Sequence, residues 1–125
     1  MQQQNLLDRT TIVALSTPPG VSAIALIRLS GDDAIAITNK VFDKDILNAS
    51  GYSVHYGSIK NGENAVDDVI VTIFKGPKSF TGENSVEIAC HGSTFIQQSI
   101  IELLLKNGAT VAKAGEFSKR AFFNG

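Results

Sequence analysis

Cysteine is nearly absent from this chain of 125 residues, and so is an excess of charge of either sign. The single cysteine, Cys90, excludes an internal disulfide framework and a zinc site built from Cys-x-x-Cys pairs. Eleven basic residues oppose twelve acidic ones, which gives a formal net charge of −1. This balance disfavours a strongly basic nucleic-acid-binding domain and a polybasic membrane segment, although it is compatible with a local basic patch.

Long apolar runs are also missing. None approaches the roughly 20 residues that a helix needs to span a bilayer, and the segment Met1–Asn5 lacks the basic start of a signal peptide. We therefore expect a cytoplasmic protein with no membrane segment. A hydrophobic fraction of 43% and a charged fraction of 18% are typical of a globular domain. We expect a flexible arm at residues 1–9 and one folded domain at residues 10–125.

Neither of the two common nucleotide-binding loops is present. Gly57 and Gly62 have the glycine spacing of a phosphate-binding loop, but Glu63 stands where that loop requires lysine. The G-x-G-x-x-G pattern of dinucleotide-binding domains does not occur. The chain is therefore not expected to bind a nucleotide by either route.

Alternation, turns and helical spacing predict the order strand-strand-helix-strand-strand-strand-helix-strand-helix. Asn61-Gly62 is the strongest hairpin signal in the chain. This order predicts an α+β fold, with a mixed, mostly antiparallel sheet and helices on one face. The expected strands are 10–16, 22–29, 52–60, 66–74, 84–91 and 110–111, and the expected helices are 32–42, one from 94 that stops at 107–108, and 116–124.

Two helix starts are predicted from capping residues. Ser30 with Asp33, and Thr94 with Gln97, each have the three-residue spacing of a capping box. The apolar run at 22–29 predicts a central strand that is covered on both faces.

Two charged residues are prominent because each is the sole charge in an apolar strand. They are Arg28 and Glu87, the latter on the same strand face as Ala89. An unpaired buried charge is costly, so we expect both side chains near a shared cleft. The loop at 76–83 either lines that cleft or is an ordinary connection. One interpretation is a structural ion pair. The other is a polar clamp for a planar ligand, because a carboxylate accepts paired N–H bonds and arginine donates to carbonyl or carboxylate groups.

The remaining reactive side chains favour structural roles. Cys90 and His91 are adjacent in a strand and point to opposite faces, so they cannot act together as nucleophile and base. Cys90 is interpreted as a small core residue, and His91, before Gly92 at a strand-to-helix corner, as structural rather than catalytic. His55 lacks the further ligands that a metal site needs. A basic group near the end is interpreted as a solvated helix face: Lys113, Lys119 and Arg120.

Five motifs follow one another from about residue 10 to the last residue. They are residues 11–14 with 17–20, residues 27–31, residues 76–77 with 79–83, Glu87 with His91-Gly92, and residues 115–117 with 120–122 and 124–125. Together they resemble the N-terminal domain of the tRNA-modifying GTPases of the MnmE (TrmE) family. The chain departs from that pattern at Asn84, where an acidic residue is usual, and at Ser93, where glycine is usual.

The resemblance implies a tetrahydrofolate-binding and homodimerising domain, similar in fold to the tetrahydrofolate-binding domain of aminomethyltransferases. It implies that the family acts with the flavoprotein MnmG on the wobble uridine of tRNA, to which a 5-formyl or 5,10-methylene tetrahydrofolate derivative supplies a one-carbon unit. GTP, Mg²⁺ and K⁺ are implied only for a GTPase domain whose motifs this chain lacks. The chain is then interpreted as an N-terminal piece of a longer GTP-hydrolysing enzyme.

The same resemblance assigns roles to individual residues. The family's folate-contacting arginine and glutamate fall on Arg28 and Glu87, and its lysine contact falls on position 126, directly after Gly125. Catalytic and metal-binding residues are not expected here. Two alternatives remain open: a purely structural dimerisation module, and a folate-dependent aminomethyltransferase-like domain.

Overall fold

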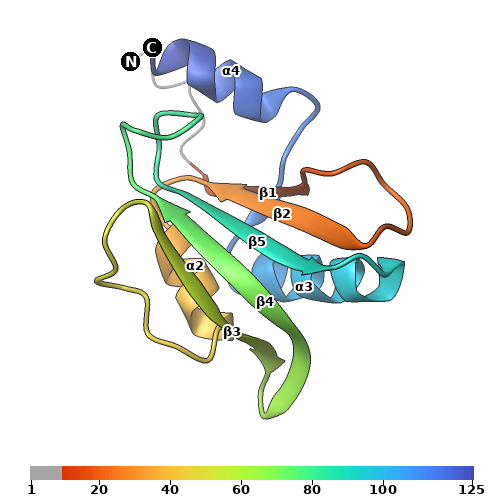
Figure 1. The fold of residues 1–125 in the computed structure, drawn as a ribbon. Helices are drawn as coiled ribbons and strands as arrows, with labels where there is room; N and C mark the ends of the chain where they lie inside the picture. The colour runs from red at the N-terminus through yellow and green to blue at the C-terminus, as the bar shows by residue number, and fades with distance from the viewer. Residues whose placement is uncertain (1–9) are drawn as a thin grey trace.

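A computed structural model describes residues 10–125, and within them six strands form one sheet in the order β3-β4-β5-β2-β1-β6 (Figure 1). Neighbouring strands are antiparallel except β1 and β6, which are parallel. The predicted α+β fold with a mixed, mostly antiparallel sheet is therefore confirmed. The predicted arm at 1–9 lies outside the described residues. The strands are β1 (Ile12–Leu15), β2 (Ile24–Ser30), β3 (Ser53–Asn61), β4 (Asn64–Phe74), β5 (Ser85–His91) and β6 (Thr110–Val111).

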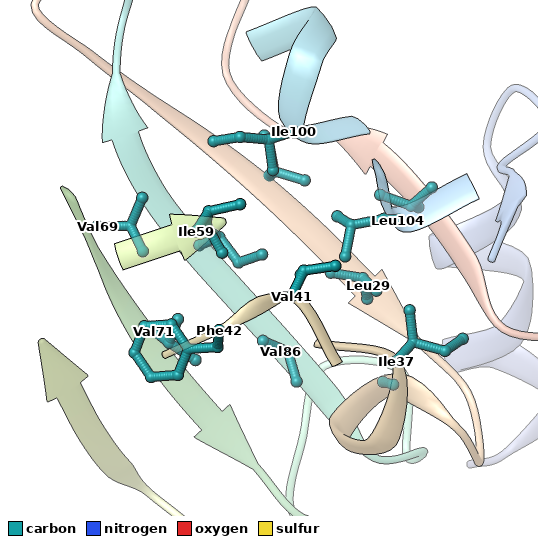
Figure 2. Packing of buried hydrophobic residues seen from close by; sticks show 14 of the residues in the cluster. Leu29, Ile37, Val41, Phe42, Ile59, Val69, Val71, Val86, Ile100 and Leu104 are labelled. Carbon is teal, nitrogen blue, oxygen red and sulfur yellow. The ribbon is translucent and has the colours of Figure 1, made fainter. Parts of the chain in front are cut away.

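Two helices cover one face of this sheet. They are α2 (Ala34–Val41) and α3 (Thr94–Lys106), whose apolar sides meet the inner side chains of the strands in a single core (Figure 2). The third helix, α4 (Glu116–Phe123), lies on the other side of the sheet, above β1 and β2 in the view of Figure 1. Helices on one face are thus confirmed for α2 and α3 only. Side chains labelled in the core include Leu29, Ile37, Val41, Val86, Ile100 and Leu104.

The predicted hairpin at Asn61-Gly62 is confirmed. Asn61 pairs with Asn64, and Gly62 takes a left-handed conformation with φ of 64° in the turn between them. A register shift between Ile59 and Lys60 interrupts the regular alternation just before this turn. An irregularity of this kind changes the direction of a neighbouring side chain, here that of Lys60.

Both predicted helix caps are wrong. The side chain of Ser30 is buried at the end of β2, where its hydroxyl donates to Glu83 in the loop that precedes β5. Asp33, at the start of α2, makes no side-chain cap bond. At α3 the cap is Ser93, one residue earlier than predicted, and its hydroxyl accepts from the Ile96 N–H at 3.0 Å. The side-chain amide of Gln97 instead donates to the backbone carbonyls of Gly20 and Gly92.

Strand β2 is central in the sheet, but its second face is open at the Ile24 end and covered only toward Ser30, so the prediction of two covered faces is wrong for the strand as a whole. Ala25, Ile27 and Leu29 are fully buried beneath the helices, whereas Ile24 on the other face is 64% exposed. The sequence of β2 is apolar on both faces of the strand because the open face also carries apolar residues. Arg28 therefore lies on an exposed face that is itself largely apolar.

Cys90 is a core residue, as predicted, with 3% of its surface exposed. Desolvation, and secondly the charge of Asp67, raise the pKa of its thiol from 9.0 to about 11. Between these values the unfolded chain has lost the thiol proton while the folded chain keeps it, so the unfolded state binds fewer protons. The free energy of unfolding is then expected to fall by about 2–3 kcal/mol as the pH rises through this range.

Urea denaturation at several alkaline pH values measures this fall. Cys90→Ala is the matched variant, because it removes the thiol while every lysine and tyrosine still titrates. Its free energy of unfolding is expected to start lower and to decline less steeply with pH. Parallel pH profiles for the two proteins would contradict the assignment.

Candidate functional site

Arg28 and Glu87 lie directly opposite each other on β2 and β5, on the sheet face that α2 and α3 leave open. Arg28 Nη2 donates to Glu87 Oε2 at 2.8 Å, and Nε donates to the same oxygen at 3.1 Å. Each side chain is 24% exposed. Within residues 10–125, Glu87 Oε1 and Arg28 Nη1 make no hydrogen bond. The pair thus presents one acceptor and one donor to a further partner.

Two phenylalanine rings flank the arginine. Phe80, from the loop at 76–83, has its ring centre 5.5 Å from Arg28 Cζ, and Phe117 of α4 lies at 5.8 Å. Both distances are in the range of cation–π attraction. We call Arg28, Glu87, Phe80 and Phe117 the clamp. Charged groups between aromatic side chains suit a flat, polar heterocycle.

A buried network holds the two elements that carry these rings. Arg120 Nη2 donates to Glu116 Oε2 at 2.9 Å, and Nη1 lies 3.3 Å from both carboxylate oxygens of Glu83. The Ser30 hydroxyl donates to Glu83 Oε1 at 2.6 Å. Glu83 closes the loop and Glu116 begins α4, so Arg120 ties the loop to the helix, and Ser30 ties the loop to the end of β2 (Figure 1).

Arg120 is a residue whose position the sequence interpretation missed. It is only 1% exposed, so the prediction of a solvated face is wrong for Arg120, although Lys113 and Lys119 are exposed. Its side chain turns inward because acceptors lie there, including the Thr10 carbonyl at 2.6 Å from Nη1. The four-residue spacing from Glu116 was the available signal, since residues four apart on a helix are neighbours.

Beside the clamp the open face is apolar and hollowed. The strand register places Leu26, Ala89, Ile70 and Tyr56 in one row, two residues along from Arg28 and Glu87. A hollow of about 280 Å³ opens over Tyr56, Ile70 and Ala89 of this row and reaches His91. A ligand held at the clamp can extend over this surface.

The histidines form local contacts. His91 Nδ1 lies 2.7 Å from Asp67 Oδ1, and its backbone N–H donates to Asp67 Oδ2 at 2.8 Å, which fastens β5 to β4. His55 Nε2 lies 2.9 Å from the Ser53 hydroxyl. In residues 10–125 no cluster of three side chains is arranged to hold a metal ion. Helices in that same range are all too short or too polar to cross a membrane.

The fold and the clamp define an α+β domain that presents two charges and two aromatic rings on an otherwise open sheet face. Residues 11–125 match the model of the family described as "GTP-binding protein TrmE N-terminus". The chain belongs to this family, which confirms the resemblance inferred from its motifs.

Several bacterial relatives named "tRNA modification GTPase MnmE" are similar over nearly the whole chain. The relative from Flavobacterium psychrophilum is 53% identical over 124 residues, which cover 96% of this chain and 27% of the relative. The one from Cytophaga hutchinsonii is 54% identical over 116 residues, covering 92% and 25%. The one from Enterococcus faecalis is 44% identical over 128 residues, covering 98% and 28%. This chain thus spans about a quarter of the length of the relatives that it matches.

Proposed function

We propose that this chain is the tetrahydrofolate-binding and homodimerising domain of a tRNA modification GTPase. The observation that carries the proposal is the clamp: an arginine fixes one oxygen of a carboxylate and leaves the other open, between two aromatic rings. The family to which the chain belongs supports the tRNA modification context.

The donor set of the clamp fits a reduced pterin. Glu87 Oε1 accepts hydrogen bonds from the pterin amino group and the adjacent ring N–H, while Arg28 keeps the carboxylate charged and oriented. Arg28 Nη1 is placed to donate to a carbonyl of the ligand. Phe80 and Phe117, which flank Arg28, offer apolar contact to the ring. Tetrahydrofolate, when bound, supplies the one-carbon unit, and these residues bind and orient it.

Homodimerisation is supported by the open face. Large apolar side chains there are solvent-exposed in the single chain, with Val54 at 65%, Tyr56 at 62% and Ile70 at 45%. A contiguous apolar surface of this kind marks an interaction site more often than a free surface. A second copy that covers it also encloses the clamp, which joins folate binding to dimerisation.

We extend the proposal to a whole protein of the length of these relatives, about a quarter of which this chain matches. That protein acts as a GTP hydrolase, with Mg²⁺ and K⁺ serving its GTPase domain. It works with MnmG and uses the folate-borne one-carbon unit to modify the wobble uridine of tRNA.

Analytical ultracentrifugation, with and without 5-formyltetrahydrofolate, tests the function proposed for this chain. We expect a mass of about twice 13.3 kDa, stabilised by the folate and accompanied by co-sedimenting ligand. A dimer that forms equally with and without folate, and carries no ligand, favours the purely structural dimerisation module. The exposed apolar face is the specific evidence for that module. A monomer that binds no folate contradicts both parts of the proposal.

A further inference from the structure

We propose that the helix-covered side of the domain binds the phosphodiester backbone of RNA, through a hollow lined by Lys40, Lys60 and Lys106. The hollow has a volume of about 390 Å³ and lies where α2, α3 and the β3–β4 turn meet. It is separated from the clamp by the sheet, because the clamp occupies the opposite face. This inference rests on the proposed function only in taking tRNA as the RNA.

The three lysines converge from separate elements. Lys40 lies in the last turn of α2, Lys106 in the last turn of α3, and Lys60 just before the β3–β4 turn. The register shift between Ile59 and Lys60 interrupts the strand alternation at this position. A chain with a net charge of −1 therefore gathers three positive charges around one hollow.

These lysines have no carboxylate partner in an ion pair within the described residues, and Lys40 and Lys106 each lie beside the partial negative charge of a helix C-terminus. None of them forms an ion pair in residues 10–125, where the ion pairs involve other side chains. Nor is Lys106 needed to cap α3. The last carbonyls of that helix already accept backbone N–H groups of Asn107, Gly108 and Ala109, and the Asn107 amide as well. Like charges in one hollow repel one another, and a bound anion relieves that repulsion.

The geometry favours a polyanion over a free phosphate ion. Compact phosphate sites are usually built from backbone N–H groups at helix N-termini, but α2 and α3 both end beside this hollow and present no N-terminus to it. The partial negative charge of those helix ends offsets part of the positive charge of the lysines, so a single small anion would bind weakly. Lysine side chains are flexible point charges that can reach successive phosphates. RNA gains affinity from each such contact by releasing counterions, which a single small anion does not.

The test is fluorescence anisotropy of a labelled RNA stem-loop, titrated with this chain over a series of NaCl concentrations. The variant is the triple change Lys40→Gln, Lys60→Gln and Lys106→Gln. The matched control is Lys75→Gln, Lys113→Gln and Lys119→Gln, which removes the same charge from three exposed lysines elsewhere. Circular dichroism and thermal denaturation establish that all three proteins are equally folded.

We expect the hollow variant to bind RNA at least about tenfold more weakly at low salt, with the slope of log affinity against log salt reduced by about two to three. The control triple is expected to change the slope by less than about one. Equal losses in both variants, or no RNA binding by the unmodified chain, would overturn the proposal.

Two further measurements separate the possible sources of phosphate and the proposed function. Inorganic phosphate and pyrophosphate are titrated by calorimetry, and saturable binding of either without RNA binding would overturn the RNA assignment. The hollow variant is expected to bind 5-formyltetrahydrofolate as the unmodified chain does, because the clamp is untouched. If neither the unmodified chain nor the hollow variant binds folate, the proposed function fails while the RNA result is unaffected.

Discussion

Replacing Arg120 with leucine is expected to lower the free energy of unfolding by about 3–5 kcal/mol, because it leaves one buried and one largely buried carboxylate without their shared cation. Glu83 and Glu116 have side chains that are only 14% and 8% exposed, and Arg120 contacts both. Urea denaturation followed by circular dichroism measures the change.

Two controls distinguish this network from a general effect of substitution in α4. Lys119→Leu, at the exposed neighbouring position, is expected to change the free energy of unfolding by no more than about 0.5 kcal/mol. Arg120→Lys keeps the charge but lacks the planar fork that reaches Glu83, Glu116 and the Thr10 carbonyl, so it should restore only part of the stability. A loss below about 1 kcal/mol in Arg120→Leu would show that water replaces the arginine.

Arg120 is also a positioning residue for the clamp. Its partners close the loop that carries Phe80 and begin the helix that carries Phe117, while Arg120 itself does not contact Arg28 or Glu87 among the bonds described for residues 10–125. Below its unfolding temperature, Arg120→Leu is therefore expected to bind folate more weakly through misplaced aromatic side chains.

Glu87→Ala is expected to weaken binding of 5-formyltetrahydrofolate at least about tenfold, since each charge-assisted hydrogen bond to the pterin contributes about 1.5–3 kcal/mol. Glu87→Gln tests the donor–acceptor pattern, because its amide nitrogen would face the N–H groups of the ligand. Arg28→Ala should also weaken binding, since Glu87 then loses both of its hydrogen bonds to Arg28.

Isothermal titration calorimetry measures these affinities, with Glu63→Ala as the matched control. Glu63 is an exposed carboxylate in the β3–β4 turn, away from the clamp, so its removal should leave the affinity unchanged. Equal affinity of Glu87→Ala and the unmodified chain would show that the Arg28–Glu87 pair is purely structural.

The parts of the fold that depend on local patterns could be predicted from the sequence. The alternation of Val86, Ile88 and Cys90 with Glu87 and Ala89 identified β5 and its two faces, because side-chain direction in a strand has a period of two. The lone charges at Arg28 and Glu87 identified the pair, since each apolar strand offered a single charge that needed a partner.

The parts that depend on distant contacts could not be predicted. Arg120 meets Glu83 across 37 positions, and Ser30 meets Glu83 across 53, so no local pattern predicts either contact. The four-residue spacing from Glu116 signals only the contact within α4. Ser30 illustrates the same limit, because its capping signal was outcompeted by acceptors from a loop that packs against β2. The lysine hollow also joins three elements that are separate in the chain.

A crystal structure of this chain with 5-formyltetrahydrofolate would decide where the ligand binds. We expect the amino and ring N–H groups of the pterin at about 2.7–3.2 Å from the Glu87 carboxylate, with the ring next to Arg28 and its two flanking phenylalanines. Folate bound on the helix-covered side of the sheet, or at a site that leaves the Arg28–Glu87 pair untouched, would contradict the proposed function.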